Sequence, residues 1–221
     1  TQSRSSAASN VYKRQAEPAV ERSVRFYMSE RRYEHTLGVR RTAVALAGLY
    51  RCDPGKAALA SLLHDIARDM PLERMQRIVL DGYPRFSCAR EVFRDPLLLH
   101  APAGCVIARE DFGVRDREVL RSIELHTTGG PSMGILEKVV FVADFIEPGR
   151  RFKGVKKARA LARRDLDDTV LFIYGFTLIS LVERGRYMCE RTIMGYNELI
   201  VQKGYGDVHG NQDQPAEISD R

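Results

Sequence analysis

The sequence contains little cysteine and no tryptophan. Its 221 residues include four cysteines that are widely spaced and form no Cys-x-x-Cys pair. This spacing argues against a thiolate zinc site and against a disulfide framework, so we expect reduced thiols and a cytoplasmic protein. The four cysteines are Cys52, Cys88, Cys105 and Cys189.

Long apolar runs are also missing. The longest run extends from Val170 to Val182 and is flanked by charged residues, whereas a membrane span requires roughly 18 or more apolar residues. No positively charged and then apolar leader is visible near the start of the chain, so we predict no membrane partner. We interpret the run as a buried core helix. A homodimer surface on the same helix remains an open alternative.

Alternation of apolar and polar residues, which marks a half-buried strand, is absent from the chain. Helix signals are frequent instead: Asp53-Pro54 is typical of an N-cap and a first helical residue, and Gly82 ends a second predicted helix that begins near Pro71. Further helix starts are predicted at Pro96, Asp116 and Asp167/Asp168, with stops at Gly113 and Gly129-Gly130. We predict an all-α bundle of roughly eight to ten helices. A helical stretch from Arg31 to Tyr50 precedes the helix that opens at Pro54, which we expect to run to Ala67.

The predicted domain covers residues 19–203. Residues 1–18 are rich in Ser, Ala, Gln and Asn without periodicity, and the tail from Gly204 to Arg221 is rich in Gly, Asp, Gln and Pro. Both segments have the composition of disordered chain. The tail contains His209, which we therefore set aside as a functional candidate.

The chain carries an excess of positive charge, with a formal net charge of +6 and a pI of about 9.2. Part of the excess is concentrated between Arg150 and Arg164. Such a patch is compatible with a phosphorylated small molecule, with nucleic acid, or with a solvated helix face, which is the commonest origin.

Asp144 is the residue whose position alone is most informative. Apolar residues recur at helical spacing from Leu136 to Ala143, and Asp144 continues the same stripe. Its carboxylate should therefore face the interior, where it requires a cation or a full set of hydrogen-bond donors. An internal ion pair with Arg or Lys would satisfy it as well as a metal ion would.

Four of the five histidines precede Asp144 on predicted helices. A single histidine at such a position is more often a core or surface residue than a ligand. Taken together, imidazoles and carboxylates on several helices, without thiolates, form a site suited to iron, manganese, magnesium or zinc. The candidate ligands are His35, His64, Asp65, His100, His126 and Asp144.

The motifs around these residues resemble the HD phosphohydrolase superfamily, whose signature is the order H…H-D…D. Within it, the chain is similar to the bacterial symmetrical diadenosine tetraphosphate hydrolases over about residues 20–203. The most specific motifs are His126-Thr-Thr-Gly129 and Ala143-Asp-Phe-Ile-Glu-Pro-Gly-Arg150. Three others support them: Arg32-Tyr-Glu-His35, Leu63-His64-Asp65-Ile-Ala-Arg68, and Leu99-His100-Ala-Pro-Ala-Gly104.

The resemblance implies an HD-type helical bundle with a metal site in its core, and it assigns roles to individual residues. His35, His64, Asp65 and Asp144 would bind the first metal ion, with iron expected over manganese or zinc. His64 and Asp65 would carry the catalysis, and His100 and His126 would reach a second metal ion or the phosphates. Substrate contacts would come from Arg32, Arg68, His100, His126, Thr127, Asp144, Arg150, Arg191 and Asn197.

The reaction implied is hydrolysis of a dinucleoside tetraphosphate at its centre to give two nucleoside diphosphates. Another HD nucleotide phosphatase or phosphodiesterase is an alternative of the same class. A nucleotide- or RNA-binding module on the same fold is an alternative of a different class, motivated by the basic segment after Arg150. We expect a small-molecule substrate and no nucleic-acid partner. The sequence leaves open the metal identity and number, the preference between adenine and guanine, any general base, the physiological role and the oligomeric state.

Overall fold

The computed structural model describes residues 19–83 and 89–205, and this part of the chain is helical without any strand. The predicted all-α class is confirmed. After helical residues 19–24, the structure contains η1 (Arg25–Tyr27), α2 (Glu30–Leu49), α3 (Pro54–Leu63), α4 (Leu72–Gly82), α5 (Arg90–Arg94), α6 (Pro96–Glu110), α7 (Arg117–Leu125), α8 (Ile135–Ile146), α9 (Val155–Leu161), α10 (Leu166–Glu183) and α11 (Glu190–Gln202).

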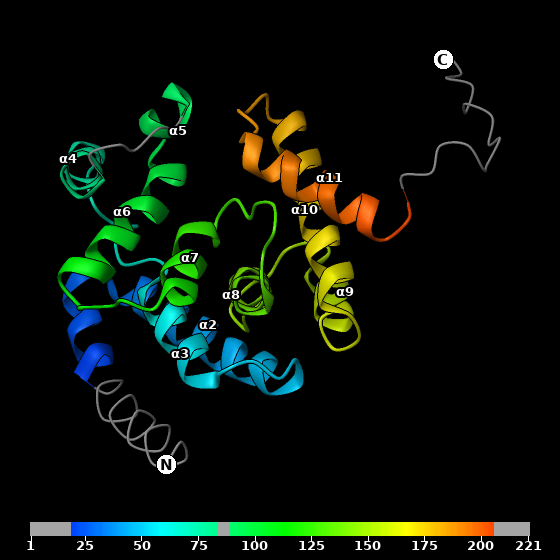
Figure 1. The fold of residues 1–221 in the computed structure, drawn as a ribbon, viewed down its shortest axis with the longest axis horizontal. Helices are drawn as coiled ribbons and strands as arrows, with labels where there is room; N and C mark the ends of the chain where they lie inside the picture. Colours follow the sequence, from blue (N-terminus) through cyan, green and yellow to red (C-terminus); the bar gives the residue numbers. More distant parts are fainter. Residues whose placement is uncertain (1–18, 84–88, 206–221) are drawn as a thin grey trace, which may run out of the picture.

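Helix α8 occupies the centre of the bundle, with α4, α5 and α6 on one side and α9, α10 and α11 on the other (Figure 1). Seven of its apolar residues are buried, among them Val139, Val140 and Val142. A helix that is apolar nearly all round needs partners on every side. Its neighbours include α2, α7 and α10.

Aspartates cap several of the helices that hold the site. Asp53, Asp95 and Asp116 each accept hydrogen bonds from backbone N–H groups at the start of α3, α6 and α7. Such a cap stabilises a helix by about 1 kcal/mol. The predicted starts at these positions are confirmed. The cap of α10 is Asp165, so Asp167 and Asp168 lie in its first turn instead.

Helix α3 is shorter than predicted. It ends at Leu63 and is followed by a run of tight turns through residue 69, rather than continuing to Ala67. Hydrogen bonds from Ile66 N–H to the Leu63 carbonyl and from Arg68 N–H to the Asp65 carbonyl close these turns. The pair His64-Asp65 therefore lies at a helix end, where the chain changes direction and aims both side chains into the bundle.

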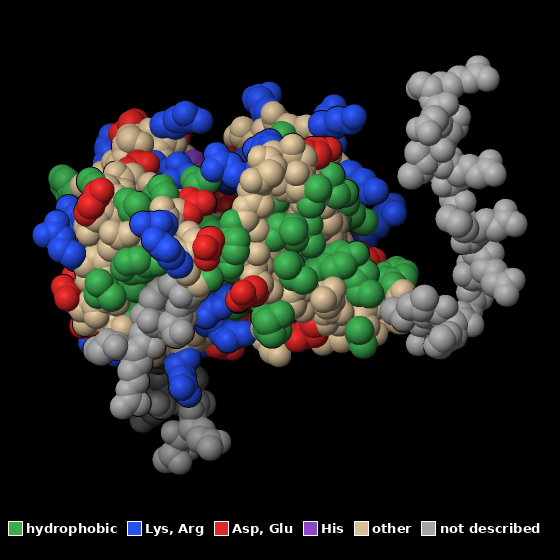
Figure 2. All heavy atoms as spheres, turned by 90° about the horizontal axis from the view of Figure 1, so that it is seen from above, with side chains coloured by type: hydrophobic (Ala, Val, Ile, Leu, Met, Phe, Trp, Pro, Cys, Tyr) green, Lys and Arg blue, Asp and Glu red, His purple; other side chains and the backbone are tan. Residues whose placement is uncertain are grey.

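Helix α10 is not the fully buried core helix that the apolar run predicted. Its first half is buried at Val170, Ile173 and Tyr174, but the side chains of Ile179 and Val182 are 62% and 65% exposed. Figure 2 shows hydrophobic side chains over the half of the molecule that carries α10 and α11. The helix extends beyond the elements that cover its first half. The apolar run from Val170 to Val182 does not show where those neighbouring elements end.

This leaves the predictions about the two ends of the chain, the cysteines and membrane spans. The predicted disorder of residues 1–18 lies outside the described residues, as do Cys88 and the tail from residue 206. Cys52, Cys105 and Cys189 are free thiols. Within the described chain, no helix combines the length and the apolar character that crossing a bilayer demands.

Candidate metal centre

All six predicted ligands converge on one place in the bundle interior. His35 comes from α2, the pair His64-Asp65 from the turn after α3, and His100 from α6. His126 follows the last residue of α7, and Asp144 lies in α8. Gly104 allows α6 to come close to the His64 turn, because a Cβ atom there would lie 3.5 Å from the His64 carbonyl oxygen and 3.3 Å from Ile66.

The carboxylate of Asp65 stands between two pairs of imidazoles. Its Oδ2 lies 3.8 Å from His35 Nε2 and 3.5 Å from His64 Nε2. Its Oδ1 lies 3.1 Å from His100 Nε2 and 3.5 Å from His126 Nε2. Two groups of potential ligand atoms, His35/His64/Asp65 and Asp65/His100/His126, are each compact enough to hold a metal ion, and they share Asp65.

In three of the imidazole rings, the nitrogen that faces away from the centre, Nδ1, contacts a backbone carbonyl oxygen. Nδ1 of His64 lies 2.7 Å from the Ser61 carbonyl oxygen, and Nδ1 of His126 lies 2.7 Å from that of Ile123. Nδ1 of His100 lies 3.3 Å from the Pro96 carbonyl oxygen. A carbonyl oxygen only accepts hydrogen bonds, so these nitrogens carry the proton and each neutral ring presents a lone pair at Nε2.

Lone pairs therefore face one another across the centre. His100 Nε2 and His126 Nε2 are 3.0 Å apart, and His64 Nε2 is buried without a hydrogen-bond partner among the described residues. A buried acceptor without a partner is costly, and converging acceptors require positive charge between them. A divalent metal ion supplies that charge. The residues present thus fit a metal centre, and this His/Asp cluster could hold one.

The ionisation of Asp65 agrees with this role. Burial by itself raises the pKa of the Asp65 carboxyl, but the neighbouring imidazoles of His64, His100 and His126 lower it well below its usual range. For His100, burial dominates and lowers the pKa of the imidazole. At neutral pH the centre consequently offers a carboxylate beside a neutral imidazole, the protonation states that metal ligands need.

Asp144 faces the centre as predicted, with 21% of its side chain exposed. Its Oδ1 lies 3.0 Å from His35 Nε2, 3.9 Å from His64 Nε2 and 2.6 Å from an amino nitrogen of Arg150. Burial would raise the pKa of Asp144, but the His35 hydrogen bond and the Arg150 charge lower it far more. The internal ion pair considered for this residue is therefore present, and the same carboxylate faces potential metal ligands.

The predicted substrate-contact residues fall into two groups. Arg32 donates to Asp65 Oδ2 at 2.6 Å, and Thr127 Oγ1 lies 3.0 Å from His126 Nε2. The positive charge of Arg68 contributes to lowering the pKa of His100. The other two form no hydrogen bond or ion pair with the cluster: Arg191 pairs with Glu124 at 2.7 Å, and Asn197 is exposed on α11.

The loop after His126 has backbone N–H groups that are bound within the protein. Gly129 N–H donates to the Leu125 carbonyl at 2.7 Å, and Gly130 N–H donates to the Tyr174 hydroxyl at 2.9 Å. Tyr174 is fully buried in α10. A distant helix therefore holds the loop in place, and these two N–H groups are not available to a phosphate.

Glu147 is a site residue to which the sequence analysis gave no role. It is buried after the end of α8, and its Oε1 lies 3.2 Å from His35 Nδ1, the nitrogen that faces away from Asp65. Its Oε2 accepts from Gly149 N–H at 2.5 Å. Gly38 makes this approach possible, because a Cβ there would lie 2.7 Å from Glu147 Oε2.

Replacing Glu147 with Gln should weaken metal binding. The charge that orients His35 would be lost while the size of the side chain is kept, and such outer partners typically contribute about 10- to 100-fold in metal affinity or activity. Competitive titration with a metal-sensitive dye measures the affinity. Glu198→Gln is the matched control, because Glu198 binds the Ser132 backbone N–H on the surface. Equal affinities in the two variants would contradict a role for Glu147.

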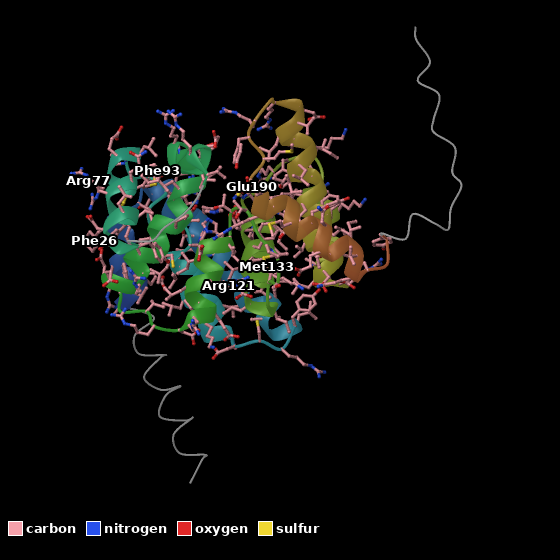
Figure 3. All side chains as sticks on the ribbon, turned by 45° about the horizontal axis from the view of Figure 1, so that its top comes forward. Phe26, Arg77, Phe93, Arg121, Met133 and Glu190 are labelled. Carbon is pink, nitrogen blue, oxygen red and sulfur yellow. The ribbon has the colours of Figure 1, made fainter. Side chains whose placement is uncertain are left out.

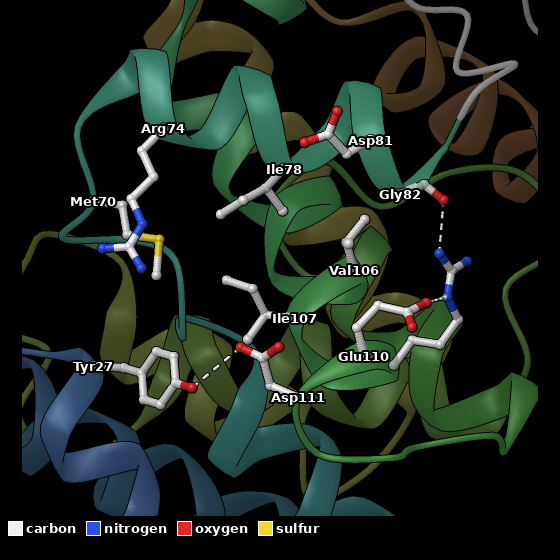
Figure 4. A pocket seen from close by; sticks show the side chains of 11 residues that line it. Tyr27, Met70, Arg74, Ile78, Asp81, Gly82, Val106, Ile107, Glu110 and Asp111 are labelled. Carbon is white, nitrogen blue, oxygen red and sulfur yellow. Dashed lines mark hydrogen bonds and ion pairs between the residues drawn. The ribbon is translucent and has the colours of Figure 1, made fainter.

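A cavity of about 580 Å³ lies away from the cluster, between α4 and α6, and none of the cluster residues lines it. Figure 4 shows an apolar floor that includes Ile78, Val106 and Ile107, with Tyr27 hydrogen-bonded to Asp111 at its edge. Nothing in it combines imidazoles with carboxylates. The chemistry of the molecule is therefore concentrated at the cluster around Asp65.

The geometry agrees with comparisons to known proteins. The HD domain family matches residues 32–149, a span that includes His35, His64, Asp65 and Asp144. This chain belongs to the HD domain family. A crystal structure from Clostridium acetobutylicum, described as that of a predicted HD superfamily hydrolase involved in NAD metabolism, superimposes on this HD domain with a TM-score of 0.80 and 38% identity. The match covers 84% of this chain and 97% of that one.

Two relatives of this HD domain carry the name symmetrical bis(5'-nucleosyl)-tetraphosphatase. The protein from Halalkalibacterium halodurans is 38% identical over 180 residues, which cover 81% of this chain and 95% of the relative. The protein from Bacillus subtilis is 37% identical over 178 residues, which cover 80% and 94%. The resemblance inferred from the motifs is confirmed.

Proposed function

We propose that this HD domain is a metal-dependent hydrolase that cleaves diadenosine tetraphosphate at its centre to give two molecules of ADP. The observation that carries the proposal is the convergence of four imidazole Nε2 atoms on the two oxygens of one buried carboxylate, Asp65. The relatives named symmetrical bis(5'-nucleosyl)-tetraphosphatase supply the substrate and the position of the cleaved bond.

The ligand set supports two metal ions that share Asp65. His35, His64 and Asp144 would complete the first position, and His100 with His126 the second. Nitrogen and carboxylate ligands without thiolate suit iron(II), which we propose as the physiological metal, with manganese or zinc as alternatives. Metal ions at such a site supply Lewis acidity to the phosphoryl oxygens and a more acidic water.

The chain's own residues position and neutralise the phosphates. Arg32 and Arg150 lie at the edges of the cluster, where their guanidinium groups already contact the carboxylates of Asp65 and Asp144. Guanidinium groups bind phosphate oxygens with two parallel donors. Thr127, beside both His100 and His126, offers a hydroxyl to the same side of the centre. We also propose substrate contacts for Arg68, Arg191 and Asn197.

Metal binding should weaken as the pH falls. Burial lowers the pKa of His35, but Asp144 and Asp65 raise it more, so the net shift is upward from 6.5. A proton therefore competes with the metal for this imidazole below and around that raised pKa, and affinity is regained as the pH rises through it. Calorimetric titration with manganese at several pH values, in buffers with different ionisation enthalpies, would show proton release. Affinity independent of pH between 6 and 8 would contradict the assignment of His35.

Removing and restoring the metal tests the proposed function. Protein stripped with a chelator should lose hydrolysis of diadenosine tetraphosphate and regain it with iron(II), more than with manganese or zinc. Metal analysis of the reloaded protein should give two ions per chain. Full activity in stripped, metal-free protein would overturn the proposal, and a single ion at full activity would remove the second metal position from it.

A further inference from the structure

The cluster opens into a groove of about 380 Å³ between α2 and the segment that follows α8. His35, Arg32 and Arg150 line its inner end, next to Asp65 and Asp144. Two more arginines, Arg31 and Arg41, line the same groove on α2. They belong to none of the motifs that pointed to the metal centre, and nothing described so far gives them a role.

Helical geometry explains why these residues share the groove. Positions 31, 35, 38 and 41 lie on one face of α2, and with a rise of 1.5 Å per residue the α-carbons of Arg31 and Arg41 are about 15 Å apart along the axis. His35 stands between them. Gly38, which has no side chain, admits the Glu147 carboxylate, because a Cβ atom there would lie 2.7 Å from Glu147 Oε2.

The charges of Arg31 and Arg41 differ from those of the neighbouring arginines in lacking a partner. Arg25 pairs with Glu30, and Arg40 pairs with Glu21. Arg31 and Arg41 are exposed and form no ion pair among the described residues. Two carboxylates, Glu34 and Glu147, also line the groove, and Glu147 is already bound by His35 and Gly149. Arg32 and Arg150 are paired with Asp65 and Asp144, so the guanidinium groups of the groove without an ion pair among the described residues are those of Arg31 and Arg41.

Resting on the proposed function, we propose that Arg31 and Arg41 bind the outer phosphates of the substrate half that lies on the His35 side of the metal centre. The inner phosphates would lie at the cluster between Arg32 and Arg150. The outer phosphate and its nucleoside would then extend along α2 into the groove. A neighbouring surface depression shares Pro148 and Arg150 with this groove and continues over residues 151–157, which gives the nucleoside open room.

In this arrangement, the affinity of the groove depends on the number of phosphates in the bound chain. A single phosphate reaches only the cluster and the arginines beside it. A chain of several phosphates, with a negative charge on each, extends far enough to contact Arg31 or Arg41 as well. Charge-assisted hydrogen bonds between guanidinium and phosphate are among the stronger ones in proteins, so the groove favours dinucleoside polyphosphates over short phosphate esters.

The test uses the double variant Arg31→Ala/Arg41→Ala in the metal-loaded protein. KM for diadenosine tetraphosphate should rise about tenfold with kcat nearly unchanged, the pattern expected when binding contacts equal in ground and transition state are lost. The control removes two charges elsewhere, with Arg77→Ala and Arg163→Ala. Both residues are exposed and outside the groove, and Arg77 points outward at the edge of the molecule in Figure 3.

Calorimetric binding of inorganic tripolyphosphate and orthophosphate separates the groove from the substrate assignment. The double variant should bind tripolyphosphate about tenfold more weakly and orthophosphate as the wild type does. Unchanged tripolyphosphate affinity, or an equal loss in the control, would overturn the proposal for Arg31 and Arg41. The wild type could fail to hydrolyse diadenosine tetraphosphate while the double variant still binds tripolyphosphate more weakly. That result would support phosphate binding by Arg31 and Arg41 and would contradict the proposed substrate.

Discussion

Replacing Asp65 with Asn should lower hydrolysis of diadenosine tetraphosphate by about 10³-fold or more, on the scale of losses that follow removal of a catalytic residue. The change keeps the size of the side chain but removes the negative charge that faces His35 and His64 on one side and His100 and His126 on the other. Because both candidate metal positions share this carboxylate, metal content should fall together with activity. Metal analysis and product assay on the same preparation measure both.

The control for this variant is Asp111→Asn. Asp111 accepts a hydrogen bond from Tyr27 at the surface cavity between α4 and α6 and contacts none of the cluster residues. The activity and metal content of the Asp111→Asn variant should remain within about twofold of the wild type, as is usual for surface substitutions. If Asp65→Asn retained more than a tenth of the activity with two bound metal ions, Asp65 would not be the shared ligand.

Replacing Gly129 with Ala should destabilise the fold by about 3–5 kcal/mol, which combines backbone strain with overpacking. Gly129 has a φ of +60°, and a Cβ atom there would lie 2.2 Å from the Tyr174 hydroxyl and 2.7 Å from its ring. Tyr174 is fully buried and also binds Gly130, so it has no free direction in which to move. The loop that carries His126 and Thr127 should shift, and activity should fall with stability.

Gly113→Ala separates the two causes. Gly113 has a φ of +65°, but a Cβ atom there would meet nothing within 4 Å. This variant should show the backbone strain alone, about 1 kcal/mol, with activity unchanged. Urea denaturation monitored by circular dichroism gives both free energies of unfolding. Equal losses at the two glycines would show that contact with Tyr174 contributes nothing.

The candidate ligands of the centre could be predicted because their signals are local. Asp144 continues an apolar stripe on one predicted helix, and His64-Asp65 belongs to a short motif that carries the family resemblance. Helix starts at Pro54 and Pro96 are equally local, since an aspartate cap and a proline stand side by side at each. These features depend on residues within a few positions of one another.

The features that sequence reasoning missed depend on contacts between distant segments. The oxygens that bind Nδ1 of His64 and His126 are the backbone carbonyls of Ser61 and Ile123. Every residue has a backbone carbonyl, so residue identity does not predict this contact. The Gly130 N–H is bound by Tyr174, a residue 44 positions further along the chain. The exposure of the second half of α10 depends on where the neighbouring helices end, which cannot be predicted from the sequence of α10 alone.

The contact between Glu147 and His35 shows the same limit. These residues are 112 positions apart, and their approach requires that residue 38 have no Cβ atom. Glu147 belonged to a motif that identified the family, yet its role became visible only when α2 and the end of α8 were placed together. The sequence could therefore locate the candidate metal ligands but not the groups that orient them.

Product analysis of diadenosine tetraphosphate hydrolysis by the metal-loaded protein tests the central claim most directly. Anion-exchange chromatography at early times should show ADP as the sole nucleotide product, dependent on metal and absent with Asp65→Asn. AMP together with ATP would contradict cleavage at the centre of the tetraphosphate. No product at all, from protein with two bound metal ions, would contradict diadenosine tetraphosphate as the substrate.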